Sequence, residues 1–137
     1  MIKQAIIPLA GLGTRMLPLT SVVPKELMPI NGKPNLEYIL EECLEAGIKE
    51  FIFIIFKKKL SIKKYFFNDN FYKKIIKKKK DKRLIEEFKK IKKYQKMIKF
   101  VYQNKPKGTG DAVLKCQKYI KSKYFLMLLP DDLILKN

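Results

Sequence analysis

Residues 51–56 constrain the fold more than any other segment. They read Phe-Ile-Phe-Ile-Ile-Phe and contain no polar side chain. Aromatic and β-branched residues favour strands. A strand that is apolar on both faces has to be covered on both faces, which is typical of a parallel sheet between two layers of helices. The segment therefore predicts the interior of an α/β fold.

The rest of the sequence supplies the other parts of such a fold. Asn35 is expected to cap the first helix, and Gly47 to end it in the left-handed conformation. Alternating strands and helices argue for one α/β domain over residues 1–137, with a mostly parallel sheet and helices on both faces. The patterns predict strands at 2–7, 98–102 and 124–129, the last also wholly apolar, and helices at 35–46, 60–66, 71–95 and 110–120.

The predicted loop over residues 8–34 is long enough to suggest a functional role. Gly11 and Gly13 follow the first strand, and Arg15 and Lys25 come next. Glycines allow backbone N–H groups to approach a polyanion, and the two cations can hold phosphate oxygens. The loop lacks the Gly-Lys-Ser/Thr of a P-loop, and Met16 excludes G-x-G-x-x-G. These features favour a nucleoside triphosphate site of another kind.

Two further groups are expected at the same edge of the sheet, because ligands of parallel sheets bind at the carboxyl ends of the strands. Gln103 and Gly108 lie in a polar loop after one strand, and Asp131 and Asp132 follow another. The two acids could simply cap a helix. Beside a triphosphate, however, paired carboxylates suit Mg²⁺.

Taken together, Gly11-Leu12-Gly13-Thr14-Arg15, Pro24-Lys25-Glu26 and Leu129-Pro130-Asp131 resemble the signature of the sugar-1-phosphate nucleotidyltransferase family, and most of all its uridylyl-transferring members. The resemblance covers nearly the whole chain. It implies a Rossmann-like, mostly parallel sheet flanked by helices. It also implies Mg²⁺ as cofactor, UTP and glucose 1-phosphate as substrates, and UDP-glucose and pyrophosphate as products.

The resemblance assigns roles residue by residue. Arg15 and Lys25 are the implied catalytic residues, and Asp131 is the implied metal ligand. Gln103 is expected to read the uracil edge, while Glu26 could instead only pair with a neighbouring cation. The implied nucleotide-binding residues are Leu9, Ala10, Gly11, Gly13, Thr14, Arg15, Lys25, Glu26, Gln103, Gly108 and Asp131.

The chain also departs from the family pattern. Asp111 stands where a histidine is usual, an unfavourable change beside a triphosphate, and Phe56-Lys57 replaces Gly-Arg. Members of the family are considerably longer, and their sugar-phosphate groups lie in the half that follows. We therefore expect residues 1–137 to be the N-terminal nucleotide-binding part without the sugar-binding half. Such a chain is expected to turn over little UDP-glucose by itself and to form a homo-oligomer or join a complementary chain.

Composition limits the remaining classes. The net charge is +18, but only Arg15 and Arg83 among the 31 basic residues are arginine. Nucleic-acid surfaces favour arginine, so we expect no specific nucleic-acid partner. No apolar run is long enough to span a membrane. Cys43 and Cys116 are expected to be buried free thiols in a reducing cytoplasm. Three alternatives stay open: a relative for another base or sugar, such as a thymidylyltransferase, a non-catalytic nucleotide-binding fragment, and a basic nucleic-acid-binding module.

Overall fold

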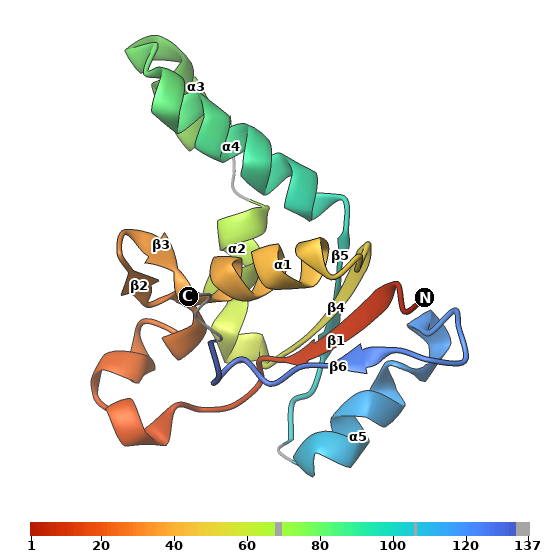
Figure 1. Ribbon diagram of the computed structural model, residues 1–137. Coiled ribbons are helices and arrows are strands. Elements are labelled where there is room, and N and C mark those ends of the chain that lie inside the picture. Colours follow the sequence, from red (N-terminus) through yellow and green to blue (C-terminus); the bar gives the residue numbers. More distant parts are fainter. Residues whose placement is uncertain (68–69, 106, 134–137) are drawn as a thin grey trace.

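Four parallel strands form the central sheet, in the order β5-β4-β1-β6 (Figure 1). The computed structural model describes residues 1–67, 70–105 and 107–133. Parallel pairing confirms the predicted α/β class and follows from the crossover helices that separate the strands in sequence. The strands are β1 (Gln4–Pro8), β4 (Glu50–Ile55), β5 (Ile98–Tyr102) and β6 (Leu126–Met127).

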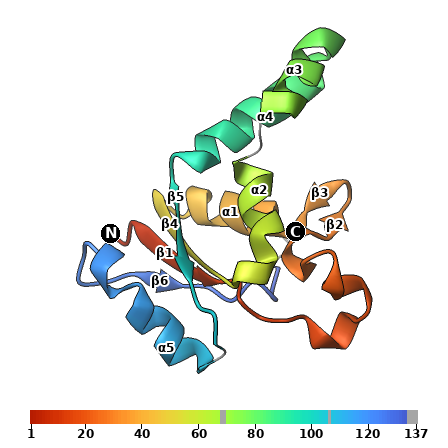
Figure 2. The same cartoon turned by 180° about the vertical axis from the view of Figure 1, so that it is seen from behind.

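Both faces of β1 and β4 are buried because successive side chains point to opposite sides. Ile7 and Phe53 face a core formed with α1 (Asn35–Glu45) and α2 (Leu60–Phe66). Ile6 and Ile52, which are register partners, face a second core beneath α5 (Gly108–Lys115). Figure 2 shows α5 on the side of the sheet opposite to α1 and α2. The all-apolar strand predicted at residues 51–56 is thus confirmed as a strand between two layers.

The long loop after β1 contains only short elements. Three single 3₁₀ turns, η1 (Thr14–Met16), η2 (Leu19–Ser21) and η3 (Lys25–Leu27), precede a small antiparallel hairpin. Its strands are β2 (Pro29–Ile30) and β3 (Lys33–Pro34). Asn31 and Gly32 join them with positive φ, as a tight hairpin turn requires. The hairpin leads directly into α1.

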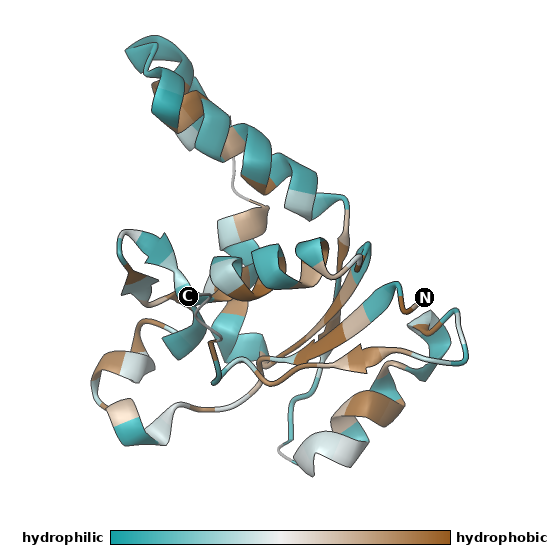
Figure 3. Cartoon of the chain, viewed as in Figure 1, coloured by the Kyte–Doolittle hydropathy of each residue, from teal (hydrophilic) through white to brown (hydrophobic). Residues whose placement is uncertain are grey.

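The lysine-rich segment forms two helices, so the single helix predicted over 71–95 is wrong. These are α3 (Asn70–Lys79) and α4 (Lys82–Gln95). Lys80 has φ +53, and Asp81 caps α4 by accepting a hydrogen bond from the Leu84 amide. The Asp81 cap offers the backbone an alternative to a continuous helix. Both helices extend away from the sheet and are largely hydrophilic (Figure 3).

Two other helix predictions need correction. Asn35 is the first residue of α1 rather than its cap, and its Nδ2 donates to the Pro130 carbonyl at 3.2 Å. The predicted helix over 110–120 begins earlier, at Gly108, and ends at Lys115, with the 3₁₀ turn η5 (Gln117–Tyr119) after it. Gly47 has φ +90 after α1, as expected.

The predicted strand over 124–129 is reduced to the two residues of β6. Tyr124 and Leu129 are 65% and 53% exposed, so this apolar run is not buried like β4. Among the described residues β6 pairs only with β1. The segment therefore lies at an edge of the described sheet, where the helices above and below cover less of it.

Both cysteines are buried and unpaired, as predicted. Burial raises the pKa of the Cys43 and Cys116 thiols to about 11, so little reactive thiolate forms at neutral pH. The part of the chain that the structure describes contains no helix that is both long enough and apolar enough to cross a bilayer.

We predict that Phe53→Ala lowers the free energy of unfolding by about 3–5 kcal/mol, since large-to-small changes in a core leave a cavity. Phe53 is 0% exposed, and its ring centroid lies 5.7 Å from those of Phe66 and Phe100. Urea denaturation measures the change. Phe71→Ala, at a position 62% exposed, is the control and is expected to cost less than about 0.5 kcal/mol. Similar losses in both variants would contradict the assigned core.

Candidate functional site

The polar groups predicted from the sequence gather at the carboxyl edge of the sheet. The Leu9 amide, just after β1, donates to the Ile54 carbonyl at 2.7 Å. The Gln103 amide, just after β5, donates to the Ile55 carbonyl at 3.0 Å. Asp131 follows β6. The loops after three of the strands therefore meet on one side, which is where ligands of parallel sheets bind.

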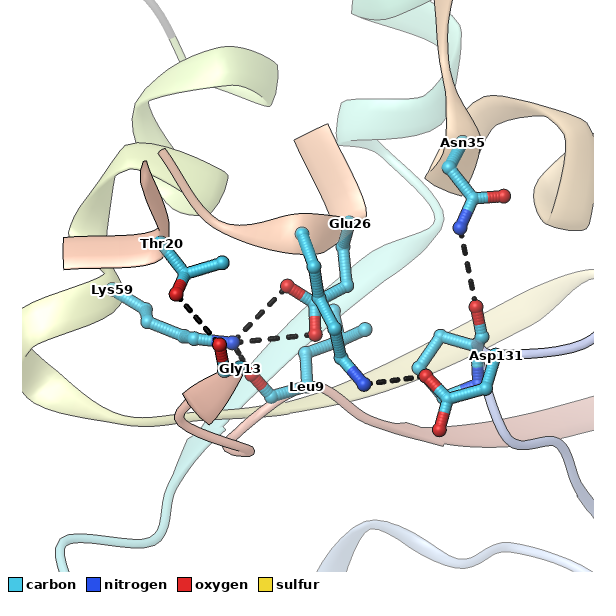
Figure 4. A network of polar contacts seen from close by, with 9 residues as sticks. Leu9, Gly13, Thr20, Glu26, Asn35, Lys59 and Asp131 are labelled. Carbon is cyan, nitrogen blue, oxygen red and sulfur yellow. Dashed lines mark hydrogen bonds and ion pairs between the residues drawn. The ribbon is translucent and has the colours of Figure 1, made fainter. Parts of the chain in front are cut away.

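The loop after β1 requires glycine at one position and leaves open space at another. Gly13 has φ +62, and a Cβ there would lie 2.9 Å from the Thr20 side chain. Thr20 Oγ1 also donates to the Gly13 carbonyl at 2.6 Å, which fixes this turn (Figure 4). Gly11, by contrast, has no heavy atom within 4 Å of the Cβ position. A ligand can therefore approach the backbone closely at Gly11.

The predicted nucleotide-binding residues near this loop differ in exposure. Leu9 is buried, and Ala10 packs against the core beneath α5. Thr14 and Arg15 are exposed in η1. Arg15 forms no ion pair with any described residue, so its guanidinium is available to an anion.

Lys25 and Asp131 are brought together although 106 residues separate them. Lys25 Nζ lies 2.5 Å from Asp131 Oδ1, and the side chains are 29% and 61% exposed (Figure 4). An ion pair this exposed is worth less than about 1 kcal/mol. Phosphate oxygens and a cation can therefore compete for the two partners. The sequence predicted both residues but not their contact.

Glu26 and Lys59 form a buried ion pair next to Lys25. Lys59 Nζ lies 3.2 and 3.1 Å from the two carboxylate oxygens of Glu26 and donates to the Leu9 carbonyl at 3.2 Å. Glu26 is 1% and Lys59 8% exposed. These contacts join the end of β1, η3 and the 3₁₀ turn η4 (Lys57–Lys59), as Figure 4 shows.

This ion pair bears on the role predicted for Glu26, and it adds Lys59 to the residues of the candidate site. The carboxylate of Glu26 holds a neighbouring cation, which is the alternative raised from the sequence, and its contact with a nucleotide stays a prediction. Lys59 was missed because it is the last of three consecutive lysines. Its position just after β4 does not distinguish it, because Lys57 and Lys58 share that position.

Gln103 is also almost buried, with 7% exposure. Its Nε2 donates to the Gly108 carbonyl at 3.2 Å and to Asp111 Oδ2 at 3.0 Å. Gly108 has φ +85 and open space at the Cβ position. The sequence marked Asp111 as an unfavourable anion beside a triphosphate. In the structure its carboxylate accepts a hydrogen bond from the side-chain amide of Gln103, the residue predicted to read the base.

The donor set limits how a metal ion could bind. Within residues 1–67, 70–105 and 107–133, no three Asp, Glu, Cys or His side chains gather as a metal site. Asp131 and Asp132 are exposed at the end of the strand. Mg²⁺ commonly takes one or two carboxylates and completes its shell with phosphates and water. The residues present therefore fit Mg²⁺ together with a nucleotide rather than a closed protein cage.

Comparison with known proteins decides the family. Residues 4–137 match the Nucleotidyl transferase family. The chain belongs to this family. It is 39% identical over 133 residues to the UTP–glucose-1-phosphate uridylyltransferase of Bacillus subtilis strain 168, covering 97% of this chain and 45% of the relative. The enzyme of the same name from Mycoplasma pneumoniae is 39% identical over 136 residues, with 97% and 45% covered.

Solved nucleotidyl transferase structures agree with this assignment. UTP-bound UGPase from Acinetobacter baumannii superposes with a TM-score of 0.87 at 37% identity, covering 96% of this chain and 46% of that one. A UDP-glucose pyrophosphorylase complexed with UDP-glucose gives 0.73 at 32% identity, with the same two coverages. The chain thus spans a little under half the length of the relatives it matches.

We predict that Lys59→Met lowers the free energy of unfolding by about 3–5 kcal/mol, because Glu26 would remain buried without its cation. Thermal or urea denaturation measures this loss. Lys58→Met is the matched control, since Lys58 is exposed in the same turn, and it is expected to change little. Adding Glu26→Gln to Lys59→Met should recover part of the loss. If Lys58→Met and Lys59→Met behaved alike, the buried ion pair would not be a stabilising contact.

Proposed function

We propose that the protein transfers UMP from UTP to glucose 1-phosphate, giving UDP-glucose and pyrophosphate, and that residues 1–137 carry the nucleotide side of this reaction. The observation that carries the proposal is the contact of Lys25 with Asp131 at the carboxyl edge of the sheet, where the loop that carries the exposed Arg15 also begins. The uridylyltransferase relatives support the choice of nucleotide and sugar phosphate.

The chemistry asks mainly for positioning and charge neutralisation. A phosphate oxygen of glucose 1-phosphate attacks the α-phosphorus of UTP in line, and pyrophosphate leaves. Arg15 offers a planar fork of donors to phosphate oxygens, and Lys25 offers a mobile point charge. Both would stabilise the negative charge of the leaving pyrophosphate. No covalent enzyme nucleophile is required.

Mg²⁺ would be held by Asp131 together with nucleotide phosphates, and it would supply further charge neutralisation when bound. The Lys25–Asp131 contact fits this role, because nucleotide and metal together provide a new partner for each side chain. Lys25 would turn to phosphate, and the carboxylate would become free for the cation.

The loops on either side of this edge would hold the base. Gln103 would face the uracil edge, and the open backbone at Gly11 and Gly108 would allow the flat ring to lie close to the chain. Thymidylyl transfer has weaker support, because the similar structure of a putative glucose-1-phosphate thymidylyltransferase from Bacillus anthracis is only 19% identical and shares the fold alone. Buried free thiols fit a reducing cytoplasm, and association into a homo-oligomer or with a complementary chain stays a prediction.

We predict that the chain binds UTP with Mg²⁺ more tightly than it binds ATP. A purine is larger than uracil and presents different donors and acceptors to Gln103. Isothermal titration of both nucleotides at the same salt concentration measures the difference. Equal affinities would contradict the uridine assignment.

We also predict that Arg15→Ala and Lys25→Ala each weaken UTP binding by about 10- to 150-fold, the range for losing one charge-assisted contact. Lys78→Ala is the control, because it removes an exposed lysine of α3 that lies on the helices extending away from the sheet. Equal losses in all three variants would mean that the nucleotide responds only to the diffuse positive field.

A further inference from the structure

The amide of Gln103 is held by two groups that can only accept hydrogen bonds. Its Nε2 lies 3.2 Å from the Gly108 carbonyl oxygen and 3.0 Å from Asp111 Oδ2. A carbonyl and an ionised carboxylate have no proton to donate, so the NH₂ end of the amide has to face them. The peptide N–H of Gln103 is itself bound to the Ile55 carbonyl, which fixes the residue at the end of β5.

This arrangement uses both amide protons of Gln103 and leaves the carbonyl oxygen of the side chain, Oε1, available as an acceptor. No described residue donates to Gln103 Oε1. A ligand that reaches this side chain therefore meets a hydrogen-bond acceptor. Uracil carries a proton on ring nitrogen N3 and can donate it, whereas the same nitrogen of cytosine is itself an acceptor. Two acceptors facing each other leave both unpaired, which is costly in a site with little water.

We propose that Asp111 is a specificity-determining residue that fixes the direction of the Gln103 amide and so selects uridine over cytidine nucleotides. This inference rests on the proposed function of the site as a UTP site. The Gly108 carbonyl favours the same direction but engages only one of the two amide protons. The carboxylate of Asp111 adds a charge-assisted bond, which is stronger than a bond between neutral groups.

A purely structural role for Asp111 is the competing explanation. It lies in the first turn of α5, where a carboxylate interacts favourably with the helix dipole. Loss of that role would lower stability and change the affinity for all nucleotides alike. Removing a negative charge near the triphosphate would also act on UTP and CTP equally. The ratio of the two affinities is therefore the measurement that separates specificity from structure and charge.

The test compares UTP and CTP binding to the 137-residue chain with Mg²⁺, in the wild type and in Asp111→Asn. An asparagine can turn its own NH₂ toward Gln103, so that only the Gly108 carbonyl still opposes rotation of the Gln103 amide, whose donor can then face cytosine N3. We expect the wild type to prefer UTP and the variant to lose about 10-fold of that preference, the size of one mispaired hydrogen bond. Asp111→Glu keeps an acceptor-only group and is expected to retain the preference.

Each outcome has a distinct meaning. An unchanged UTP-to-CTP ratio in Asp111→Asn, with UTP still bound, overturns the inference and leaves the proposed function standing. Absence of UTP binding in the wild type overturns the proposed function and the inference with it. If Asp111→Asn does not fold, Asp111→Ser replaces it, because a hydroxyl can also either donate or accept; an unchanged ratio there overturns the inference equally.

Discussion

A parallel sheet that has to be covered on both faces governs the architecture of this chain. In β1 and β4, Ile7 and Phe53 point into one core while Ile6 and Ile52 point into the other. Neither layer of helices can be omitted without exposing one of these sets. Because every crossover returns the chain in the same direction, the carboxyl ends of the strands meet at one edge. The polar loops that follow the strands therefore gather at this edge.

Two ion pairs at this edge differ in their exposure to water. Glu26 and Lys59 are buried, and the Leu9 carbonyl accepts a further hydrogen bond from the ammonium group of Lys59. Removing either partner would leave a charge in a poorly solvated place, so the pair acts as a fixed part of the framework. Lys25 is partly exposed and Asp131 is exposed, so water compensates either one when it leaves. The exposed pair can therefore exchange partners with a ligand, while the buried pair holds the backbone beneath it.

Asp111 departs from the family pattern, and its role can be judged only from its contacts in the structure. Asp111 in place of the usual histidine suggests, from the sequence, an anion facing a triphosphate. In the structure its carboxylate is directed to the amide of Gln103. The Asp111 carboxylate thus binds another side chain of the protein. It would affect a ligand by orienting the uncharged side chain of Gln103.

The sequence by itself determined the fold class and most of the helices and strands, and its motifs predicted the residues of the candidate site. Period and composition suffice for the fold class and these elements, because an apolar run such as residues 51–56 favours a strand covered on both faces. Local signals failed where a distant contact decided the outcome. Asn35 looks like a helix cap, but its side chain reaches the Pro130 carbonyl, and residues 124–129 look like β4, yet they lie at an edge of the described sheet.

Only the tertiary structure decided the partners of the charged residues. Lys59 cannot be told from Lys57 and Lys58 in the sequence, and the contacts of Lys25 with Asp131 and of Gln103 with Asp111 depend on loops that follow different strands. The physical reason is that a pattern along the chain fixes which side of an element is apolar. The pairing of polar groups, in contrast, depends on distances between elements that are set only when the whole sheet is assembled.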